Sequence, residues 1–416
     1  MKVSKVQLIK ASAPSDFKDY KAKRGSPSQN IFSAAAELKG RVELELIDET
    51  ANHLVNYKSD AQIIGIFFST PDAIRAYEIA SKFKDMGKLV FLAGLHASFM
   101  SEEALKYGHS VIQGECEGII HDLLDDYERG DILKDIYKRD SILDLKELKP
   151  YPTDLIAKED YDDFWTVTVS RGCPYKCHFC VVNPFFGKIR YRPIEQIVEE
   201  IANSKASFIE LHSDNLTADK NYAKELFQAI TPLNIKWAVA SDISIAQDDE
   251  LLRLASKSGL MYLLVGLETP SQEALKGTGK GFVKVNEIKD RIKKLHDHGI
   301  IVDSAMMFGF DEHDKSIFDR SLEFAIDVKI DVCDPVVQIP FPGTKLFKDL
   351  ESQNRILTYD WSRYNGSDAV YEPKNLSVEE LLQGQYDFYK QFNSFSNYSK
   401  RKFRQIKQLG INAFYA

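Results

Sequence analysis

The sequence predicts an α/β protein with two successive runs of alternating strands and helices and a mainly helical end. The first observation is a β-α alternation over residues 1–135, and the second is a sixfold β-α alternation over residues 164–342. The third is the helical patterning of residues 343–416. Residues 136–163, which contain a Pro-Tyr-Pro run, are expected to be a linker. A chain of 416 residues is long enough for this organisation.

The first run should form a doubly wound parallel sheet, because short apolar segments alternate with helical ones such as Pro71–Met86. In such sheets ligands bind outside the carboxyl ends of the strands. The expected strands are Val6–Ile9, Val42–Ile47, Ile63–Phe68, Leu89–Ala93 and Ser110–Ile112.

The second run predicts a partial (β/α)6 barrel, since a helix follows each of the first five expected strands. Chemistry in such barrels collects at the carboxyl ends of the strands. The expected strands are Thr166–Ser170, Phe208–His212, Lys236–Ala240, Tyr262–Leu267, Val302–Phe308 and Val332–Ile339. The clearest helices are Pro193–Ala202, Lys220–Ile230 and Asp249–Ser258.

Outside these runs, the charge-rich stretch Leu143–Leu148 is expected to be a short solvated helix. The C-terminal region, with a turn at Gly366-Ser367, is expected to cap the open barrel. Its last helix, Tyr398–Arg404, is basic and aromatic. That helix can contact an acidic lipid surface or a carrier, and a simply solvated face explains it as well.

Composition restricts the class of partner and the compartment. The net charge of −8 argues against bulk attraction to nucleic acid. Five cysteines, three of them in one short run, do not form a disulfide framework, so a reducing compartment is expected. The N-terminus lacks the apolar segment of a signal peptide, and no stretch reaches the apolar length of a transmembrane helix. We therefore expect a cytoplasmic protein without a transmembrane segment, for which peripheral membrane contact is possible.

The cysteine run is the strongest chemical signal. Cys173, Cys177 and Cys180 have the spacing C-x3-C-x2-C, directly after an expected strand. Three thiolates can hold an iron–sulfur cluster and leave one iron open, whereas ordinary [4Fe–4S] carriers use four cysteines. The alternative is a zinc knuckle, but zinc sites usually pair two such ligand units and no second unit exists here.

This cysteine run resembles that of the radical S-adenosylmethionine (SAM) enzymes. The resemblance implies that the three thiolates bind a [4Fe–4S] cluster and that SAM binds the fourth iron. Reduction, by a partner such as flavodoxin or ferredoxin, then cleaves SAM to a radical. The aromatic Phe179 before the third cysteine also matches, and the family places its backbone near the adenine.

Further SAM contacts are implied by residues at the ends of later strands. Asp214 and Asn215 match the pair that contacts the SAM amino end, although a helix cap explains them too. Ser241 matches a ribose or substrate contact, with capping again as the alternative. Glu268 lies in a Gly-Leu-Glu-Thr segment that matches the family, and a salt bridge to Lys276 or Lys280 is its alternative. Phe308 lies in the segment that resembles the adenine-contacting strand.

The N-terminal run resembles the cobalamin-binding domain that precedes many radical SAM cores. The matching segments are Gly94-Leu95-His96-Ala97-Ser98 and Gly114-Glu115-Cys116-Glu117-Gly118. One departure matters: the loop Lys10–Asp16 contains no histidine, whereas many cobalamin domains have a cobalt-binding histidine there. His53 follows the second strand and therefore lies in the wrong loop. The resemblance implies cobalamin contacts at strand ends, namely Ser69, Thr70, Gly94, His96, Gly114 and Glu115; for His96, a polar loop residue is the alternative.

The expected function is radical chemistry on an unactivated carbon of a small molecule, with cobalamin-dependent C-methylation as the first reading. Because the histidine loop is missing, a cobalamin-independent cyclisation, rearrangement or C–C bond formation stays open. A non-catalytic iron–sulfur or zinc protein is the alternative from another class. Cys333, near the sixth barrel strand, is a candidate hydrogen-atom donor, and a buried structural cysteine is the competing explanation.

Overall fold

The structure is a computed structural model that describes residues 2–13, 28–156, 161 and 165–409. Its contacts divide the chain into two compact units, each considered by itself below. The N-terminal unit comprises residues 1–165, 184–187 and 360–362. The C-terminal unit comprises residues 166–183, 188–359 and 363–416.

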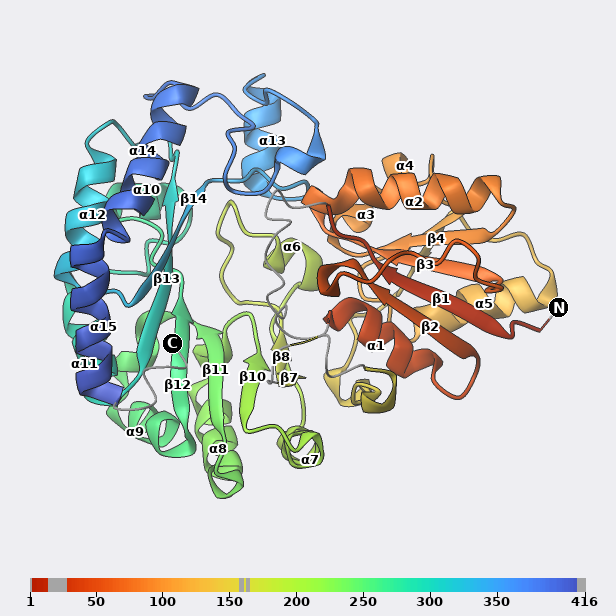
Figure 1. The fold of residues 1–416 in the computed structure, drawn as a ribbon, viewed down its shortest axis with the longest axis horizontal. Coiled ribbons are helices and arrows are strands. Elements are labelled where there is room, and N and C mark those ends of the chain that lie inside the picture. Colours follow the sequence, from red (N-terminus) through yellow and green to blue (C-terminus); the bar gives the residue numbers. More distant parts are fainter. Residues whose placement is uncertain (1, 14–27, 157–160, 162–164, 410–416) are drawn as a thin grey trace. The chain divides into compact units, whose positions relative to one another are not determined.

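The N-terminal unit is a doubly wound parallel sheet of six strands in the order β2-β1-β3-β4-β5-β6 (Figure 1). Its strands are β1 (Lys5–Lys10), β2 (Glu43–Asp48), β3 (Ile63–Phe67), β4 (Leu89–Ala93), β5 (Ser110–Gln113) and β6 (Ile136–Lys138). Its helices are α1 (Gln29–Leu38), α2 (Ala73–Asp85), α3 (Leu95–Phe99), α4 (Ser101–Ala104) and α5 (Ile119–Arg129). The strand order reverses between β1 and β3, and such a reversal opens a crevice at the carboxyl ends.

The central strands are apolar because helices cover both faces of the sheet: all five residues of β3 are buried. Figure 1 shows α2, α3 and α4 on one face and α1 and α5 on the other. The doubly wound sheet and its five expected strands are therefore confirmed.

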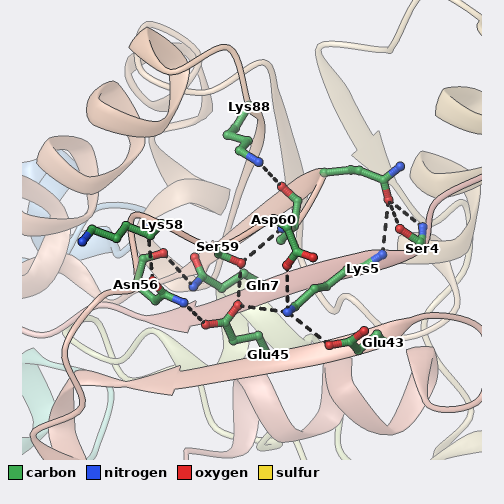
Figure 2. A network of polar contacts seen from close by, with 12 residues as sticks. Ser4, Lys5, Gln7, Glu43, Glu45, Asn56, Lys58, Ser59, Asp60 and Lys88 are labelled. Carbon is green, nitrogen blue, oxygen red and sulfur yellow. Dashed lines mark hydrogen bonds and ion pairs between the residues drawn. The ribbon is translucent and has the colours of Figure 1, made fainter.

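Polar contacts gather toward the amino ends of β1 and β2 (Figure 2). Lys5 Nζ lies 3.1 Å from a Glu43 carboxylate oxygen, 2.9 Å from Asp60 and 3.8 Å from Glu45. Glu45 also accepts hydrogen bonds from Asn56 Nδ2 (2.6 Å) and Ser59 Oγ (2.5 Å). This network holds the end of the sheet that lies opposite the carboxyl edge.

Residues 136–163, which were expected to be a linker, differ from this prediction in two details. β6 extends the N-terminal sheet, pairing Val111 with Ile136, and the N-terminal unit continues to Trp165. A strand of three residues is too short to give a periodic signal. The expected helix at Leu143–Leu148 is a single 3-10 turn, Leu145–Glu147, and its flanking leucines are buried together rather than solvated.

The C-terminal unit contains six strands in the order β14-β13-β12-β11-β10-β7, so neighbours in sequence are neighbours in space. The strands are β7 (Trp165–Thr168), β10 (Phe208–His212), β11 (Lys236–Ser241), β12 (Leu260–Val265), β13 (Ile301–Phe308) and β14 (Val332–Val337). The register is parallel for the four pairs from β10 to β14. A short antiparallel ribbon, β8 (Ser170–Arg171) with β9 (Arg190–Tyr191), flanks the cysteine run. This sheet confirms the expected partial barrel.

Helices cover the outer face of this sheet (Figure 1). Trp237 of β11, for example, packs against Phe227 of α8 with ring centroids 5.0 Å apart. The helices are α7 (Ile194–Ser204), α8 (Lys220–Ile230), α9 (Asp249–Ser258), α10 (Gln272–Gly277), α11 (Ile288–Asp297), α12 (Ile317–Asp327), α13 (Lys345–Ser352), α14 (Val378–Phe392) and α15 (Phe395–Leu409), and α6 (Val182–Phe186) is divided between the units. None of the described helices combines the length and the apolar character needed to traverse a bilayer.

Candidate active site

One pocket of the C-terminal unit brings the three cysteines together with residues from four strand ends. We call it the cysteine pocket. Its side-chain lining includes Cys173, Tyr175, Cys177, Phe179, Cys180, Asp214, Asn215, Ser241, Asp242, Glu268, Lys280 and Phe282. The pocket therefore lies at the carboxyl ends of the strands, where the fold places chemistry.

The cysteine loop is held by backbone contacts on two sides. The N–H of His178 donates to the carbonyl of Thr278 (2.9 Å), and the carbonyl of His178 accepts from the N–H of Leu346 (2.9 Å). The Asn183 side chain also donates to the carbonyl of Cys173 (3.2 Å). These contacts fix the backbone of the loop that carries the three thiols.

The chemistry of the donors fits an iron–sulfur cluster. Burial raises the pKa of the Cys177 thiol to about 11 and also raises the pKa values of Cys173 and Cys180. Metal binding would therefore displace protons from all three thiols. Among the described residues, no three His, Cys, Asp or Glu side chains converge closely enough to hold a single metal ion. A cube of four irons spreads its thiolate ligands over separate irons, so this arrangement is compatible with a cluster.

Asn215 and Asp214 connect the cysteine loop to the strand ends. The Gly172 N–H donates to Asp214 Oδ2 (2.8 Å). Asn215 donates to Asp242 Oδ2 (3.0 Å), and its Oδ1 accepts from the Ser241 hydroxyl (3.2 Å). The Asn215 side chain makes no capping hydrogen bond to the following 3-10 turn, so capping does not explain it. These residues tie β10, β11 and the cysteine loop into one polar wall.

The hydroxyl of Ser241 lies 2.5 Å from that of Thr217, and Asp242, not Ser241, caps the 3-10 turn that follows β11. Asp242 thus combines two roles: its Oδ1 accepts from the Ser244 N–H, and its Oδ2 faces Asn215. The sequence analysis singled out Ser241, whereas the structure shows that the neighbouring Asp242 also lines the pocket and presents a carboxylate there.

Glu268 is nearly fully buried and has a left-handed backbone, with φ of 64°. Its main chain continues the pairing with β13, because its N–H donates to Ala305 and its carbonyl accepts from Met307. Its side chain forms an ion pair with Lys280 across 2.5 Å. Of the two expected lysine partners, the structure selects Lys280, and both members of the pair line the cysteine pocket.

Aromatic rings form the other wall. Tyr175 stacks on Phe282 with centroids 3.7 Å apart, and Phe179 meets Phe310 edge to face at 6.3 Å. The sequence analysis missed Tyr175 and Phe282; an aromatic residue between two cluster-spaced cysteines was the available signal. The wall can accept a flat apolar ring such as adenine.

Two expected site residues have side chains elsewhere. Phe308 is fully buried on the helix-covered face, where it packs against Phe318 of α12 and Phe388 of α14. Its side chain is not available to SAM. Cys333 is also buried, and burial raises its pKa well above the ordinary value for a thiol. Cys333 does not line the cysteine pocket, which favours a structural role for this buried cysteine.

The carboxyl edge of the N-terminal sheet carries the residues expected to contact cobalamin. Gly94 follows β4 with φ of 104°, and a Cβ there would lie 2.5 Å from the Phe68 carbonyl oxygen. Gly114 follows β5 with φ of 88° and has open space within 4 Å of its Cβ position. The Ser98 hydroxyl joins the two loops, donating to the Gly94 carbonyl (2.7 Å) and accepting from the Gly114 N–H (2.9 Å). Glu115 follows in the same turn.

Ser69 and Thr70 lie beside the crevice between β1 and β3. The Ser69 hydroxyl donates to Asp72 (2.6 Å), whose carboxylate also pairs with Lys10 Nζ (2.8 Å) at the end of β1. The loop in which a histidine was sought continues from residue 14 outside the described residues. The Nδ1 of His53 accepts from the Asp48 N–H (3.2 Å), which fixes it at the end of β2.

His96 is fully buried and both of its ring nitrogens have partners. Nδ1 lies 3.2 Å from the Thr70 hydroxyl and Nε2 lies 3.5 Å from Glu103. Trp361, which belongs to the same unit, packs its ring 4.8 Å from the imidazole and donates to Glu103 (2.9 Å). Both ring nitrogens of His96 thus face protein partners, which favours a role in positioning the loops; its expected contact with cobalamin stays a prediction. Open space at Gly114 and the polar crevice at Lys10 and Asp72 still fit a large polar cofactor.

Comparison with known proteins agrees with this arrangement. The model of the radical SAM superfamily matches residues 167–325. The bacteriochlorophyllide d C-8(2)-methyltransferase of Chlorobaculum tepidum is 30% identical over 79% of this chain and 78% of its own. The bacteriochlorophyllide d C-12(1)-methyltransferase of the same organism is 27% identical over 85% and 80%.

Two solved structures share the fold. The radical SAM methyltransferase TsrM from Kitasatospora setae, with cobalamin and a [4Fe–4S] cluster bound, covers 84% of this chain and 75% of its own, with a TM-score of 0.67 and 14% identity. The cobalamin-dependent SAM radical enzyme OxsB covers 97% and 72%, with a TM-score of 0.69 and 14% identity.

The chain belongs to the radical SAM superfamily. It is an enzyme of the class that cleaves SAM reductively at a [4Fe–4S] cluster, and its relatives include methyltransferases.

Proposed function

We propose that this enzyme is a cobalamin-dependent C-methyltransferase of a small molecule, reduced by a flavodoxin- or ferredoxin-like partner. The observation that carries the proposal is the coexistence of two prepared sites in one chain. The cysteine pocket has three thiols beside a polar wall, and the N-terminal sheet has a glycine-lined carboxyl edge. The methyltransferase relatives, which cover most of this chain, support the same reaction.

The residues have separable roles. Cys173, Cys177 and Cys180 would hold the cluster, which supplies the electron for SAM cleavage, while bound cobalamin would carry the transferred methyl group. Asp214 and Asp242 present carboxylates where the SAM amino group would be held. The aromatic wall of Tyr175 and Phe282 would exclude water and fix the ring of the nucleoside. Most of the rate enhancement from this protein would therefore come from positioning.

The cluster assignment is tested by anaerobic reconstitution with iron and sulfide. We expect about four irons per chain and production of 5′-deoxyadenosine from SAM. Cys177→Ala should lose both, whereas Cys116→Ala and Cys333→Ala, which change cysteines outside the pocket, should retain both. Normal iron binding in Cys177→Ala would refute the ligand assignment.

The cobalamin assignment is tested by reconstitution with hydroxocobalamin and measurement of bound cobalt. Gly114→Phe fills the open space at the sheet edge and should lower cobalt binding while leaving iron content unchanged. Gly130→Phe is the matched control: Gly130 has φ of 78° and open space around it, but it ends α5. Equal cobalt in wild type and Gly114→Phe would contradict the proposed site.

A second candidate is a cobalamin-independent cyclisation or rearrangement. A cyclisation is supported by a relative named anaerobic magnesium-protoporphyrin IX monomethyl ester cyclase, which is 25% identical over 72% of this chain. Retention of iron without cobalt would select this candidate. Because several relatives act on tetrapyrroles by name, we propose such rings as the first substrates to assay.

A further inference from the structure

Helix α15 of the C-terminal unit presents large apolar side chains to solvent. Phe395 is 87% exposed and Phe403 is 73% exposed, and Tyr398 and Ile406 are each about half exposed. At 100° per residue these four side chains fall within an arc of roughly 140° on one side of the helix. The half-buried Lys402 lies within the same arc, with its Nζ 5.9 Å from the centre of the Tyr398 ring. Large exposed apolar side chains gathered on one side of a helix mark an interaction site.

Side chains outside this arc fix α15 to the unit. Arg401 stacks on the Phe392 ring, with its guanidinium carbon 3.9 Å from the centroid. Gln405 is buried, and Arg404 pairs with Asp331 at 2.6 Å. These contacts leave Phe395, Phe403 and Ile406 turned outward, and Figure 1 shows α15 at the outside of the unit beside α11 and α12.

The charge of α15 is uniformly positive. The helix contains Lys400, Arg401, Lys402, Arg404 and Lys407 and no acidic residue, although the whole chain has a net charge of −8. Lys400 and Lys407 are exposed and follow the flank next to Phe403. A basic flank beside an apolar face is the pattern of a helix that lies in a membrane interface.

The basic flank continues into a shallow hollow. Arg404 and Lys407 line it together with Lys289 and Lys293 of α11 and Lys329 after α12. Asp290, Asp297 and Asp327 also line it; Lys289 pairs with Asp327 (2.6 Å) and Lys293 with Asp297 (2.6 Å). The neighbouring helix α14 adds two half-exposed tyrosines, Tyr386 and Tyr389. Tyrosine is enriched where an apolar phase meets water.

We propose that α15 is a docking helix for the surface of a bilayer that contains anionic phospholipids. Phe395, Phe403 and Ile406 enter the boundary between headgroups and acyl chains, and Lys400, Lys402 and Lys407 lie against headgroup phosphates. A second copy of the chain fits the face less well, because two such faces would bring their lysines together. The inference is independent of the proposed function.

Flotation of the full chain with vesicles tests this proposal. We expect the wild type to float with vesicles of phosphatidylcholine and phosphatidylglycerol in equal amounts, less with phosphatidylcholine alone, and less at high salt. Replacing Lys400, Lys402 and Lys407 together by Gln should weaken binding about a hundredfold. Phe395→Ser with Phe403→Ser should also weaken it. Leu54→Ser is the control, because Leu54 is equally exposed but lies in the other unit.

Phe395, Lys400, Phe403 and Lys407 are exposed and Lys402 is half-buried, and circular dichroism would confirm that each variant is folded. Two flotation results would overturn the proposal: no flotation of the wild type with anionic vesicles, or equal flotation of the wild type and both α15 variants. Sedimentation that shows a dimer lost on Phe395→Ser would assign the face to a second copy instead. Retention of an acidic carrier protein by α15 without vesicle binding would also overturn it.

Discussion

Glu268 and Lys280 form a buried ion pair, with 2.5 Å between Oε1 and Nζ, on the wall that the three cluster cysteines share. Lys280 also lies 6.0 Å above the centre of the Phe179 ring. It is the one lysine among the described lining residues of the pocket. Glu268 and the nearby cysteines Cys177 and Cys180 raise its pKa against the effect of burial. Its charge therefore lies next to the metal-binding thiols.

We predict that Lys280→Met makes the cluster harder to reduce. A cation near the cluster favours the more negative, reduced state, so its removal should shift the reduction potential to a more negative value. Breaking the buried pair should also cost about 3–5 kcal/mol of stability. Redox titration followed by electron paramagnetic resonance measures the potential, with iron content as a check on loading.

Lys276→Met is the matched control for this change, because Lys276 is exposed on the same helix–loop segment. Glu268→Gln should shift the potential in the opposite direction, since it removes a negative charge from the same wall. A potential that is equal in wild type and Lys280→Met would show that the lysine only supports Glu268.

We predict that two glycine substitutions at the carboxyl edge of the N-terminal sheet lower the free energy of unfolding by different amounts. Gly94→Ala should destabilise the protein by about 2 kcal/mol or more, because the new Cβ meets the Phe68 carbonyl in a left-handed backbone. Gly114→Ala should cost only about 1 kcal/mol, because its Cβ meets open space. Denaturant unfolding measures both, and equal costs would contradict the close approach at Gly94.

We predict that His96 is not a cobalt ligand. Reconstituted cob(II)alamin should show the same electron paramagnetic resonance spectrum in wild type and His96→Ala, because both imidazole nitrogens already have partners in the protein. The substitution should instead destabilise the fold by about 2–5 kcal/mol, through a cavity and unpaired polar groups. His121→Ala, which changes a partly exposed histidine of the same unit, is the control. Loss of nitrogen splitting in His96→Ala alone would reverse this assignment.

We predict a pH-dependent gain in stability from Asp303→Asn. Burial raises the pKa of Asp303 to about 6, with the Tyr262 hydroxyl 2.5 Å from its Oδ2. Since this folded-state pKa lies above the unfolded value of 3.8, the wild type loses stability as pH rises from about 4 through 6. The loss is at most about 3 kcal/mol. The gain from Asp303→Asn should therefore be larger at pH 7.5 than at pH 5, as measured by denaturant unfolding, and an equal gain at both values would contradict it.

Most of the architecture was predictable because its signals are local. Apolar runs gave the strands around β3 and β4, and the cysteine spacing placed the pocket loop after β7. β6 was missed because three residues carry no periodicity. The alternation along β13 could have shown that the Phe308 side chain points to the buried face of the strand. Val302, Ser304 and Met306 lie on that same face.

Other features depend on contacts that no local pattern contains. The burial of His96 requires Trp361, which lies 265 positions later in the chain. The choice of Lys280 over Lys276 depends on how the loop after α10 folds back over the pocket. These contacts convert residues that looked like ligand contacts or surface charges into parts of the supporting structure.

The two backbone hydrogen bonds of His178 bear on how the enzyme responds to oxygen. Thr278 and Leu346 hold the cysteine loop from two sides through backbone hydrogen bonds that use none of the three thiols. We therefore expect the fold of this loop to outlast a cluster that oxygen destroys, so that iron and sulfide can rebuild the cluster on the same chain. Inactivation by air would then be a reversible injury that is repaired on a folded protein, not a reason for its degradation.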